Sequence, residues 1–270
     1  MQWGFSSLLV LLSLLFGSTQ VFAKDVPTAK QGVIDLRHWD FEANPTVDIK
    51  GEFEFYWMKM LEPQDLAAET PTGFLTIPSV MNFEFNGIEL HPDSYATFRV
   101  KVLLPENHPP LGYFSREVPV AYKLWLNGEA LLSQGIPGKS AATTVAKAGF
   151  PNIDIETTSS ELEMVFNLSG FLNSDVGFWN PIVIGKRDTL AADEINRVAL
   201  DSFLASCMFV MALYHFVLFA LRRQNTSALA LGVYLSLVLM RVISTNDGLL
   251  MHRYFGADYF ALKFAEYLTF

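Results

Sequence analysis

Between residues 32 and 185, apolar and polar residues alternate in short runs that Pro, Gly and Asn separate. Alternation with a period of two is typical of strands with one buried face, and it is clearest in residues 51–57 and 97–104. We expect strands at residues 47–49, 52–58, 73–77, 96–104, 121–126, 130–134, 161–168 and 181–184. Many short strands with frequent turns, and no helical period beyond residues 64–68, predict an all-β sandwich or jelly roll.

Two local features refine this β-rich region. Asn127-Gly128 lies between two apolar segments, and this dipeptide favours a type I′ hairpin turn because both central residues need a positive φ. Residues 136–160 are poor in large aliphatic side chains and rich in small and polar ones, which predicts a long surface loop. Ligand contacts are one reason for loops of that length, and a loop without such a role fits the composition equally well.

The pattern changes near residue 199. Residues 199–221 form a 23-residue stretch whose only charge is Asp201. A hydrocarbon core of about 30 Å takes roughly 20 apolar helical residues, so this stretch is long enough to span a membrane. Arg222 and Arg223 follow directly, and further apolar runs occupy residues 227–243 and 259–270. We therefore expect a multi-pass membrane protein with a large water-soluble domain ahead of its first span.

The beginning of the chain predicts export. Residues 8–16 form an apolar run that only Ser13 interrupts, which is the length of a secretory signal core rather than of a span. We expect residues 1–23 to be a signal peptide cleaved after Ala23, with an uncleaved anchor helix as the alternative. The first span then crosses inward and places Arg222 and Arg223 in the cytoplasm, where loops carry an excess of Lys and Arg.

Charge and cysteine content narrow the partners and the compartment. The formal net charge is −9, and residues 24–190 hold 13 Lys and Arg against 22 Asp and Glu. This acidity argues against nucleic acid or anionic lipid as a ligand, because basic groups dominate such binding. The single cysteine, Cys207, lies in the first apolar stretch, so the exported domain has no disulfide. A bacterial periplasm therefore fits better than a eukaryotic secretory compartment.

Several segments together resemble one bacterial family. They are residues 32–36, 38–41, 48–57, 77–78, 94–105 and 123–128 in the exported part, and residues 213–223 and 229–241 in the apolar part. The first set resembles the exported jelly-roll domain, of galactose-binding-like type, of seven-transmembrane receptors with diverse intracellular signalling modules. The second set is similar to the first two helices of that family's seven-helix region. The order of all these segments is more specific than any one of them.

The resemblance implies a division of the chain. Residues 1–23 are expected to be the signal peptide, residues 24–190 the periplasmic jelly-roll sensor domain, and residues 191–270 the start of the seven-transmembrane region. Spans are expected near residues 199–221 and 227–243, with an incomplete one at 259–270. The short segment 185–198 is expected to link the sensor domain to the first span. The protein is thus expected in the bacterial inner membrane, with its N-terminal domain in the periplasm.

The same resemblance implies a role in signal transduction. The exported domain would bind a small ligand, with carbohydrate as one class, and would pass that binding to the membrane helices. Family members carry a cytoplasmic effector enzyme after their helices, so we expect a truncated reading frame and no enzyme activity in these residues. The alternative is the carbohydrate-binding module of a membrane-tethered glycosidase, which more than one span disfavours.

Candidate ligand contacts fall in three places. Asp175, Trp179 and Asn180 bring a carboxylate, an aromatic ring and an amide to the loop before the last predicted strand. Arg116 is a donor for a polar ligand or the partner of a nearby carboxylate. Tyr56 lies on the strand face opposite its two aromatic neighbours, so it suits a ligand surface better than they do. Most other aromatic residues of this region are expected in the core, and Arg99 is expected in a structural ion pair.

Polar residues inside apolar helices are costly, so His215 and Arg241 are further candidates for function. A neighbouring helix can satisfy such a histidine, and Arg241 lies near enough to the interface to extend its charge into water. No phosphate-binding loop, nucleophile elbow or metal-ligand spacing occurs, and the five histidines are dispersed. We expect no catalytic residue, metal or cofactor. The expected partners are a small-molecule ligand and the lipid bilayer, with a homodimer as one open assembly.

Overall fold

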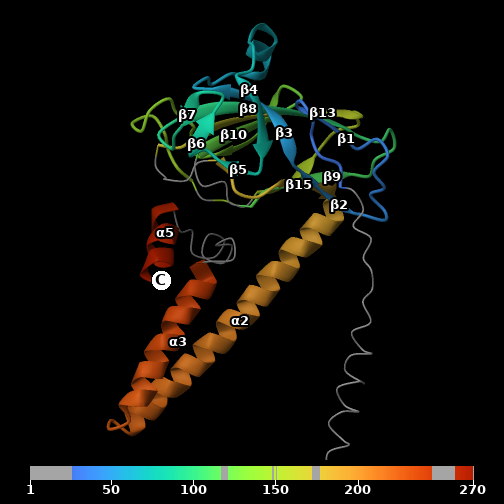
Figure 1. The fold of residues 1–270 in the computed structure, drawn as a ribbon. Helices are drawn as coiled ribbons and strands as arrows, with labels where there is room; N and C mark the ends of the chain where they lie inside the picture. Colours follow the sequence, from blue (N-terminus) through green and yellow to red (C-terminus); the bar gives the residue numbers. More distant parts are fainter. Residues whose placement is uncertain are drawn as a thin grey trace, which may run out of the picture.

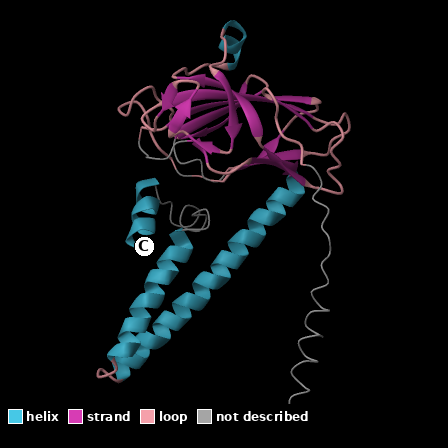
Figure 2. Ribbon diagram, in the orientation of Figure 1, coloured by secondary structure: helices cyan, strands magenta, loops and turns pink. Residues whose placement is uncertain are grey.

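The computed structural model describes residues 26–116, 121–147, 149, 151–171, 177–244 and 259–269. The expected signal peptide at residues 1–23 and the candidate ligand residue Asp175 lie outside these residues. The described part consists of a β-rich body from which long helices extend (Figure 1). Strands and helices are separated along the chain, with every long helix after the last strand (Figure 2).

The larger sheet has seven strands in the order β11-β10-β13-β8-β3-β4, with β1 added in parallel beside β8. The long strand β8 pairs with β3 around Arg99 and with β1 around Lys101. The expected hairpin joins β10 to β11, since Asn127 and Gly128 have φ values of 48° and 86°. The strands are β1 (Val33–Asp35), β3 (Gly51–Trp57), β4 (Gly73–Ile77), β8 (Tyr95–Leu103), β10 (Ala121–Leu126), β11 (Glu129–Gln134) and β13 (Glu161–Ser169).

The smaller sheet has four strands in the order β12-β9-β15-β2. Two short ribbons, β14 with β5 and β6 with β7, accompany the two sheets, and a 3₁₀ helix, η1, lies between β3 and β4. Their bounds are β2 (Thr46–Ile49), η1 (Pro63–Ala68), β5 (Ser79–Val80), β6 (Phe83–Phe85), β7 (Ile88–Leu90), β9 (Leu111–Phe114), β12 (Asn152–Ile155), β14 (Gly177–Phe178) and β15 (Ile182–Lys186).

One apolar core lies between the two sheets. The inward-facing residues of each sheet are fully or almost fully buried and belong to a single cluster. Phe178 joins it from β14 and packs edge-on against Phe98 and Phe166, with ring centroids 5.4 Å and 5.2 Å away. Edge-to-face rings at such distances attract one another in addition to burying apolar surface. The body is therefore a mostly β domain with two sheets packed face to face.

The eight predicted strands are all present, with ends within two residues of the prediction. The prediction of a surface loop over residues 136–160 is wrong in part, because β12 lies within it. β12 is a short edge strand with only two large aliphatic residues, Ile153 and Ile155, so composition hides it. β9 was not predicted because all four of its residues are buried, which removes the alternation that marks a half-exposed strand.

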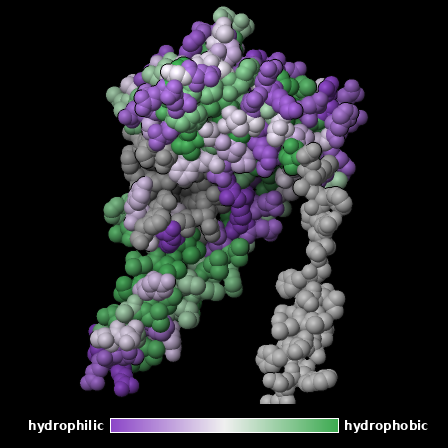
Figure 3. Space-filling view, viewed as in Figure 1, coloured by the Kyte–Doolittle hydropathy of each residue, from purple (hydrophilic) through white to green (hydrophobic). Residues whose placement is uncertain are grey.

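Two helices, α2 (Arg187–Leu221) and α3 (Thr226–Ser244), are long and apolar enough to cross a membrane. They run antiparallel and side by side, and α5 (Tyr259–Leu268) contacts α3 (Figure 1). Many large apolar side chains on them are exposed, as Phe203 is at 65%. An apolar surface covers the middle of the helix pair, with hydrophilic residues at the α2–α3 turn and next to the sheets (Figure 3). The segment expected as a linker, residues 185–198, is mostly the first part of α2.

Candidate functional site

The first three turns of α2 lie on the outer face of the small sheet. The backbone N–H of Arg187 donates to the carbonyl of Pro110 at 3.0 Å, which continues the sheet's hydrogen bonds into the helix. The side-chain amide of Asn152 on β12 donates to the carbonyl of Leu190 at 3.0 Å and to Glu194 Oε2 at 2.8 Å. The helix is therefore fixed to the sheet by directed polar bonds as well as by packing.

Gly112 on β9 allows this close approach. A Cβ atom built on Gly112 would lie 3.1 Å from Cδ1 of Leu190, which is tighter than most real contacts. Leu190 is only 3% exposed because it fills the space that the missing side chain leaves. An ion pair between Arg187 Nε and Asp154 Oδ1, at 2.9 Å, lies beside this contact. Glycine is thus favoured here by packing rather than by an unusual backbone angle.

A cavity of about 440 Å³ lies where the helix leaves the sheet. Its sheet side follows from strand register, because Val183 of β15 pairs with Asp48 of β2 and with Phe114 of β9. These three outward-facing positions form one row across the sheet. The cavity is lined from the sheet by Thr46, Asp48, Phe114, Arg116, Asn180, Pro181 and Val183, and from α2 by Leu190, Asp193 and Arg197.

The cavity is ringed by two acidic and two basic side chains. Asp48 and Arg116 come from the β body, and Asp193 and Arg197 come from one face of α2. The guanidinium of Arg197 lies over the ring of Phe114, with Cζ 4.3 Å from the ring centroid. Within the described part of the chain, none of these four groups forms an ion pair with another of them. The site therefore offers charges of both signs to a ligand.

A second, larger groove of about 710 Å³ lies between the β10–β11 hairpin and β12. Its charged lining is acidic, with Glu129, Asp154 and Glu156. Asn152 and Asp154 line this groove and also bond to α2, as described above. Among the described residues, no group of three metal-ligating side chains suited to a metal ion is found.

The structure brings together two of the residues proposed from the sequence. Arg116 and Asn180 line the same 440 Å³ cavity, although 64 positions separate them in the chain. Trp179, the neighbour of Asn180, is 46% exposed and is not among the residues that line the cavity. Of the two rim residues that the structure describes, Trp179 and Asn180, only Asn180 lines this cavity; Arg116, a separate candidate, lines it too.

Tyr56 lies elsewhere, on the outer face of the large sheet. Its ring is 1% exposed and belongs to a small buried cluster with Leu66, Trp125 and Val165. Its hydroxyl donates to Glu54 Oε2 at 2.9 Å, and burial raises the pKa of Tyr56 to about 12. The η1 segment, which carries Leu66, covers this part of the sheet face. We therefore do not retain Tyr56 as a ligand contact.

The two intramembrane candidates are far from the cavity. His215 lies in α2 and Arg241 near the end of α3. The ring of His215 meets that of Tyr214 edge-on at 5.2 Å, and its Nδ1 is buried with no hydrogen-bond partner among the described residues. A buried unsatisfied nitrogen inside an apolar helix is unusual and marks His215 as a position for contact with a further polar group.

Eight of the ten residues that line the cavity were not proposed from the sequence. Asp48, Phe114, Asp193 and Arg197 were not proposed, because nothing in the sequence places β2, β9 and α2 next to one another. One available signal was the spacing of Asp193 and Arg197, four residues apart and so on one helix face just before the apolar stretch. This spacing places the two charges on one helix face only if the helix begins before them, and the structure shows that it begins at Arg187.

No protein-family model matches the chain, and no curated protein matches it. Among solved structures, it is similar over 52% of its length to a Faecalibacterium prausnitzii beta-glucuronidase, at 13% identity and a TM-score of 0.39. A beta-glucuronidase of an uncultured Clostridium species gives 10% identity and a TM-score of 0.38 over the same share. A Ruminococcus gnavus beta-glucuronidase gives 12% and 0.37. The matched part spans only 31%, 28% and 28% of those chains, and likeness at this level assigns no function.

Proposed function

We propose that this chain is the ligand-sensing and transmembrane front part of a bacterial signal-transduction receptor, of the seven-transmembrane type with diverse intracellular signalling modules. In this proposal the β body is a galactose-binding-like jelly roll in the periplasm, and the apolar helices lie in the inner membrane. The observation that carries the proposal is the direct passage from β15 into α2. A cavity at that junction has walls from both the sheet and the helix.

This arrangement favours sensing because a ligand in the cavity contacts the β body and the first membrane helix at once. A ligand shifts a conformational equilibrium only by its differential affinity for the two states, and typical coupling energies are about 1–3 kcal/mol. Residues 187–221 contain neither Gly nor Pro, so α2 has no built-in hinge to absorb a tilt at its first turns. The tilt would reach α3, which packs along α2.

Polarity supports the orientation in the proposal. Arg222 and Arg223 lie at the turn between α2 and α3, at the end of the helix pair away from the sheets (Figure 3). Basic residues in short loops favour the cytoplasmic side. The β body then lies outside, where a periplasmic ligand can reach the cavity. The output would come from a cytoplasmic effector beyond these residues.

The test uses the full chain in lipid nanodiscs. A thermal-shift panel of neutral sugars and L-amino acids first identifies a binding compound. Hydrogen exchange then measures the exchange rates of the backbone amides of α2 and α3 with and without that compound. We expect binding to change exchange in α3, which lies outside the cavity. A flexible seven-residue Gly-Ser insertion after Val198 should keep binding and abolish the change in α3. A helical seven-residue insertion at the same place, about two turns, should retain it.

Two outcomes would overturn the proposal. One is a compound that binds in the cavity and leaves exchange in α3 unchanged. The other is an exchange response that survives the flexible insertion, because the sheet and the membrane helix would then communicate without a continuous α2. The site after Val198 is chosen because Asp193 and Arg197, which line the cavity, stay ahead of it.

A further inference from the structure

The four charged side chains around the junction cavity form no ion pair with one another in the part of the chain that the structure describes. Asp193 and Arg197 are four residues apart on α2, a spacing at which opposite charges commonly pair on a helix. In the described part of the chain they form no ion pair with each other, and the guanidinium of Arg197 lies over the ring of Phe114, with Cζ 4.3 Å from the ring centroid. Arg116 and Asp48 likewise make no ion pair within the residues that the structure describes.

Arg197 is the half-buried cation that α2 contributes to the cavity. Its Nε atom is buried and has no hydrogen-bond acceptor among the described residues. A buried donor without an acceptor loses its hydration and gains nothing in return, which costs free energy. A carboxylate is the ligand group that suits the guanidinium of Arg197 best, because a guanidinium presents parallel donors that match two carboxylate oxygens.

The acidic residues set a second requirement. Asp48 and Asp193 also line the cavity, so the four ionised side chains sum to zero charge. A simple anion would be attracted by the two arginines and repelled by the two carboxylates. A simple cation would be attracted by the two carboxylates and repelled by the two arginines. A neutral sugar would bring hydrogen-bonding groups but no charge to any of the four. A ligand with one positive and one negative end satisfies both pairs.

We infer that the junction cavity binds a small zwitterion, an α-amino acid, with its carboxylate toward Arg197 and Arg116 and its ammonium group toward Asp193 and Asp48. The inference rests on the proposed function, because it takes the junction cavity as the receptor's ligand site. The cavity volume of about 440 Å³ lies within the range of small-ligand sites, roughly 300–1,000 Å³. Phe114 and Val183 form an apolar part of the wall that the amino-acid side chain can contact.

Such a ligand would tie the helix to the sheet. Each sign of charge in the cavity comes once from the β body and once from α2. Both ends of the zwitterion therefore bridge the two elements. Binding should hold the first turns of α2 more firmly on the small sheet, in addition to the bonds that Asn152 already makes.

The experiment measures binding to the full chain in nanodiscs by isothermal titration with the twenty encoded L-amino acids. For the best binder, the matched fragments are the acid that lacks its α-ammonium group and the amine that lacks its α-carboxylate, which for alanine are propionate and ethylamine. We expect saturable binding of at least one amino acid and at least tenfold weaker binding of both fragments. Galactose serves as the uncharged probe.

Variants locate the site. Arg197→Gln and Asp193→Asn should each weaken amino-acid binding at least tenfold, whereas Lys139→Gln and Asp93→Asn, exposed charges away from the cavity, should leave it unchanged. Asp193 is exposed, so its variant should fold even where Arg197→Gln disturbs packing on Phe114. A melting temperature for each variant checks this.

The outcomes separate this inference from the proposed function. No binding by any amino acid, equal binding by either matched fragment, or wild-type affinity in Asp193→Asn would each overturn the zwitterion site. Galactose binding that Arg197→Gln abolishes would overturn the ligand class and leave the junction sensor standing. Amino-acid binding that the cavity variants weaken, without any response in α3, would support the inference and overturn the receptor role.

Discussion

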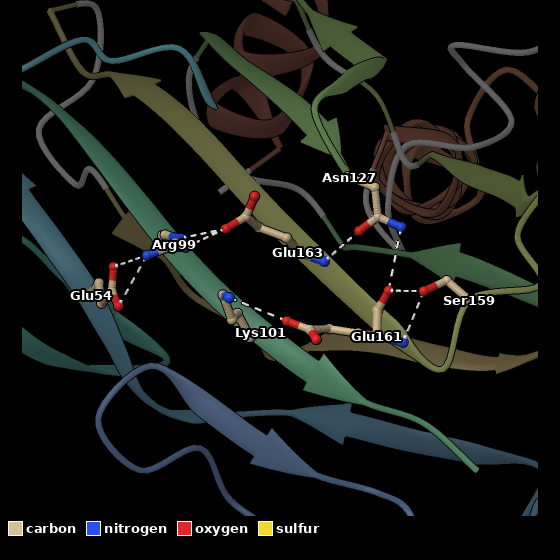
Figure 4. Close-up of polar contacts among 7 residues, drawn as sticks. All are labelled: Glu54, Arg99, Lys101, Asn127, Ser159, Glu161 and Glu163. Carbon is tan, nitrogen blue, oxygen red and sulfur yellow. Dashed lines mark hydrogen bonds and ion pairs between the residues drawn. The ribbon is translucent and has the colours of Figure 1, made fainter. Parts of the chain in front are cut away.

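Arg99 shows how a charged residue is accommodated on the outer face of the large sheet. It lies on β8 between Glu54 of β3 and Glu163 of β13 (Figure 4). Its Nη1 is 3.0 Å from Glu54 Oε2, and its Nε donates to Glu163 Oε1 at 2.7 Å. Its side chain is 22% exposed, whereas the next pair along the strand, Lys101 with Glu161, is more open at 37% and 51%. The ion pairs of Arg99 are therefore more buried than the ion pair of Lys101 with Glu161, although both basic residues lie on the same strand.

Replacing Arg99 with glutamine should destabilise the β body by about 1–3 kcal/mol, because two half-buried carboxylates lose their shared cation. This corresponds to a fall of about 2–10 °C in melting temperature for a domain of this size. Lys101→Gln is the matched control and should change stability by less than about 1 kcal/mol, as exposed pairs do. Thermal unfolding of the full chain in nanodiscs, followed by tryptophan fluorescence, measures both. Equal effects would contradict the argument from burial.

At the residue scale, the local sequence pattern predicts which face of a strand a residue lies on. It does not predict which residues of other strands lie beside it. The structural ion pair of Arg99 was predicted, because its neighbours in sequence face the core and leave it on the polar side. The site at the junction was predicted only at Arg116 and Asn180. Asp48 and Phe114 join them through the pairing of Val183 with both, and sequence periodicity says nothing about which strands become neighbours.

At the scale of elements, the position of α2 depends on one small residue. Gly112 faces outward from β9 at the point where Leu190 packs. Two hydrogen bonds join the helix to the sheet beside it: the side chain of Asn152 donates to the carbonyl of Leu190, and the backbone N–H of Arg187 donates to the carbonyl of Pro110. Where a backbone lies this close, even one methyl group must displace its neighbour or be accommodated by it. The angle between sheet and helix is thus set by packing at Gly112.

Gly112→Val should push the first turns of α2 away from the small sheet. The added methyl groups meet Leu190 Cδ1, which already lies 3.1 Å from the position of a Cβ atom. We expect hydrogen exchange of residues 187–197 to rise at least tenfold, with Gly112→Ala giving a smaller rise. Combining Gly112→Ala with Leu190→Ala should cost less stability than the sum of the two single changes, because they share one contact. Strict additivity would refute the packing argument.

The sequence predicted elements best where burial is one-sided. Strands such as β3 and β8 alternate clearly and were placed within a residue at each end. β9 could not be recognised from alternation, because all four of its residues are buried. Its outer face is covered by α2. The helical form of residues 185–198, which were predicted only as a linker, was missed for the opposite reason. Its residues are mixed in polarity because one side of the helix lies on the sheet and the other faces water.

At the scale of the whole molecule, the lengths of the two long helices differ in an informative way. α2 has 35 residues, about 52 Å of helix, and α3 has 19, about 28 Å. A hydrocarbon core of about 30 Å matches α3 and leaves about 20 Å of α2 outside. The surplus residues, 187–198, are the ones that dock on the sheet. The β body would therefore stand above the membrane surface, held by a continuous helix.

This geometry predicts that the two ends of α2 lie on opposite sides of the membrane. Single cysteines at Lys139→Cys, in the β body, and Gln224→Cys, in the exposed α2–α3 turn, test it in a Cys207→Ala background that removes the one native thiol. In intact spheroplasts, a membrane-impermeant maleimide should label the first position at once. The second should react only after the membrane is permeabilised. Residues 199–221 are apolar over a length that can cross a bilayer and lie between two polar ends, which favours a spanning position. Labelling of both cysteines in intact spheroplasts would show that α2 does not span. Labelling of Gln224→Cys alone would show that the orientation is the reverse of the one proposed. The junction cavity would then lie in the cytoplasm, and the proposal of a periplasmic sensor would be wrong.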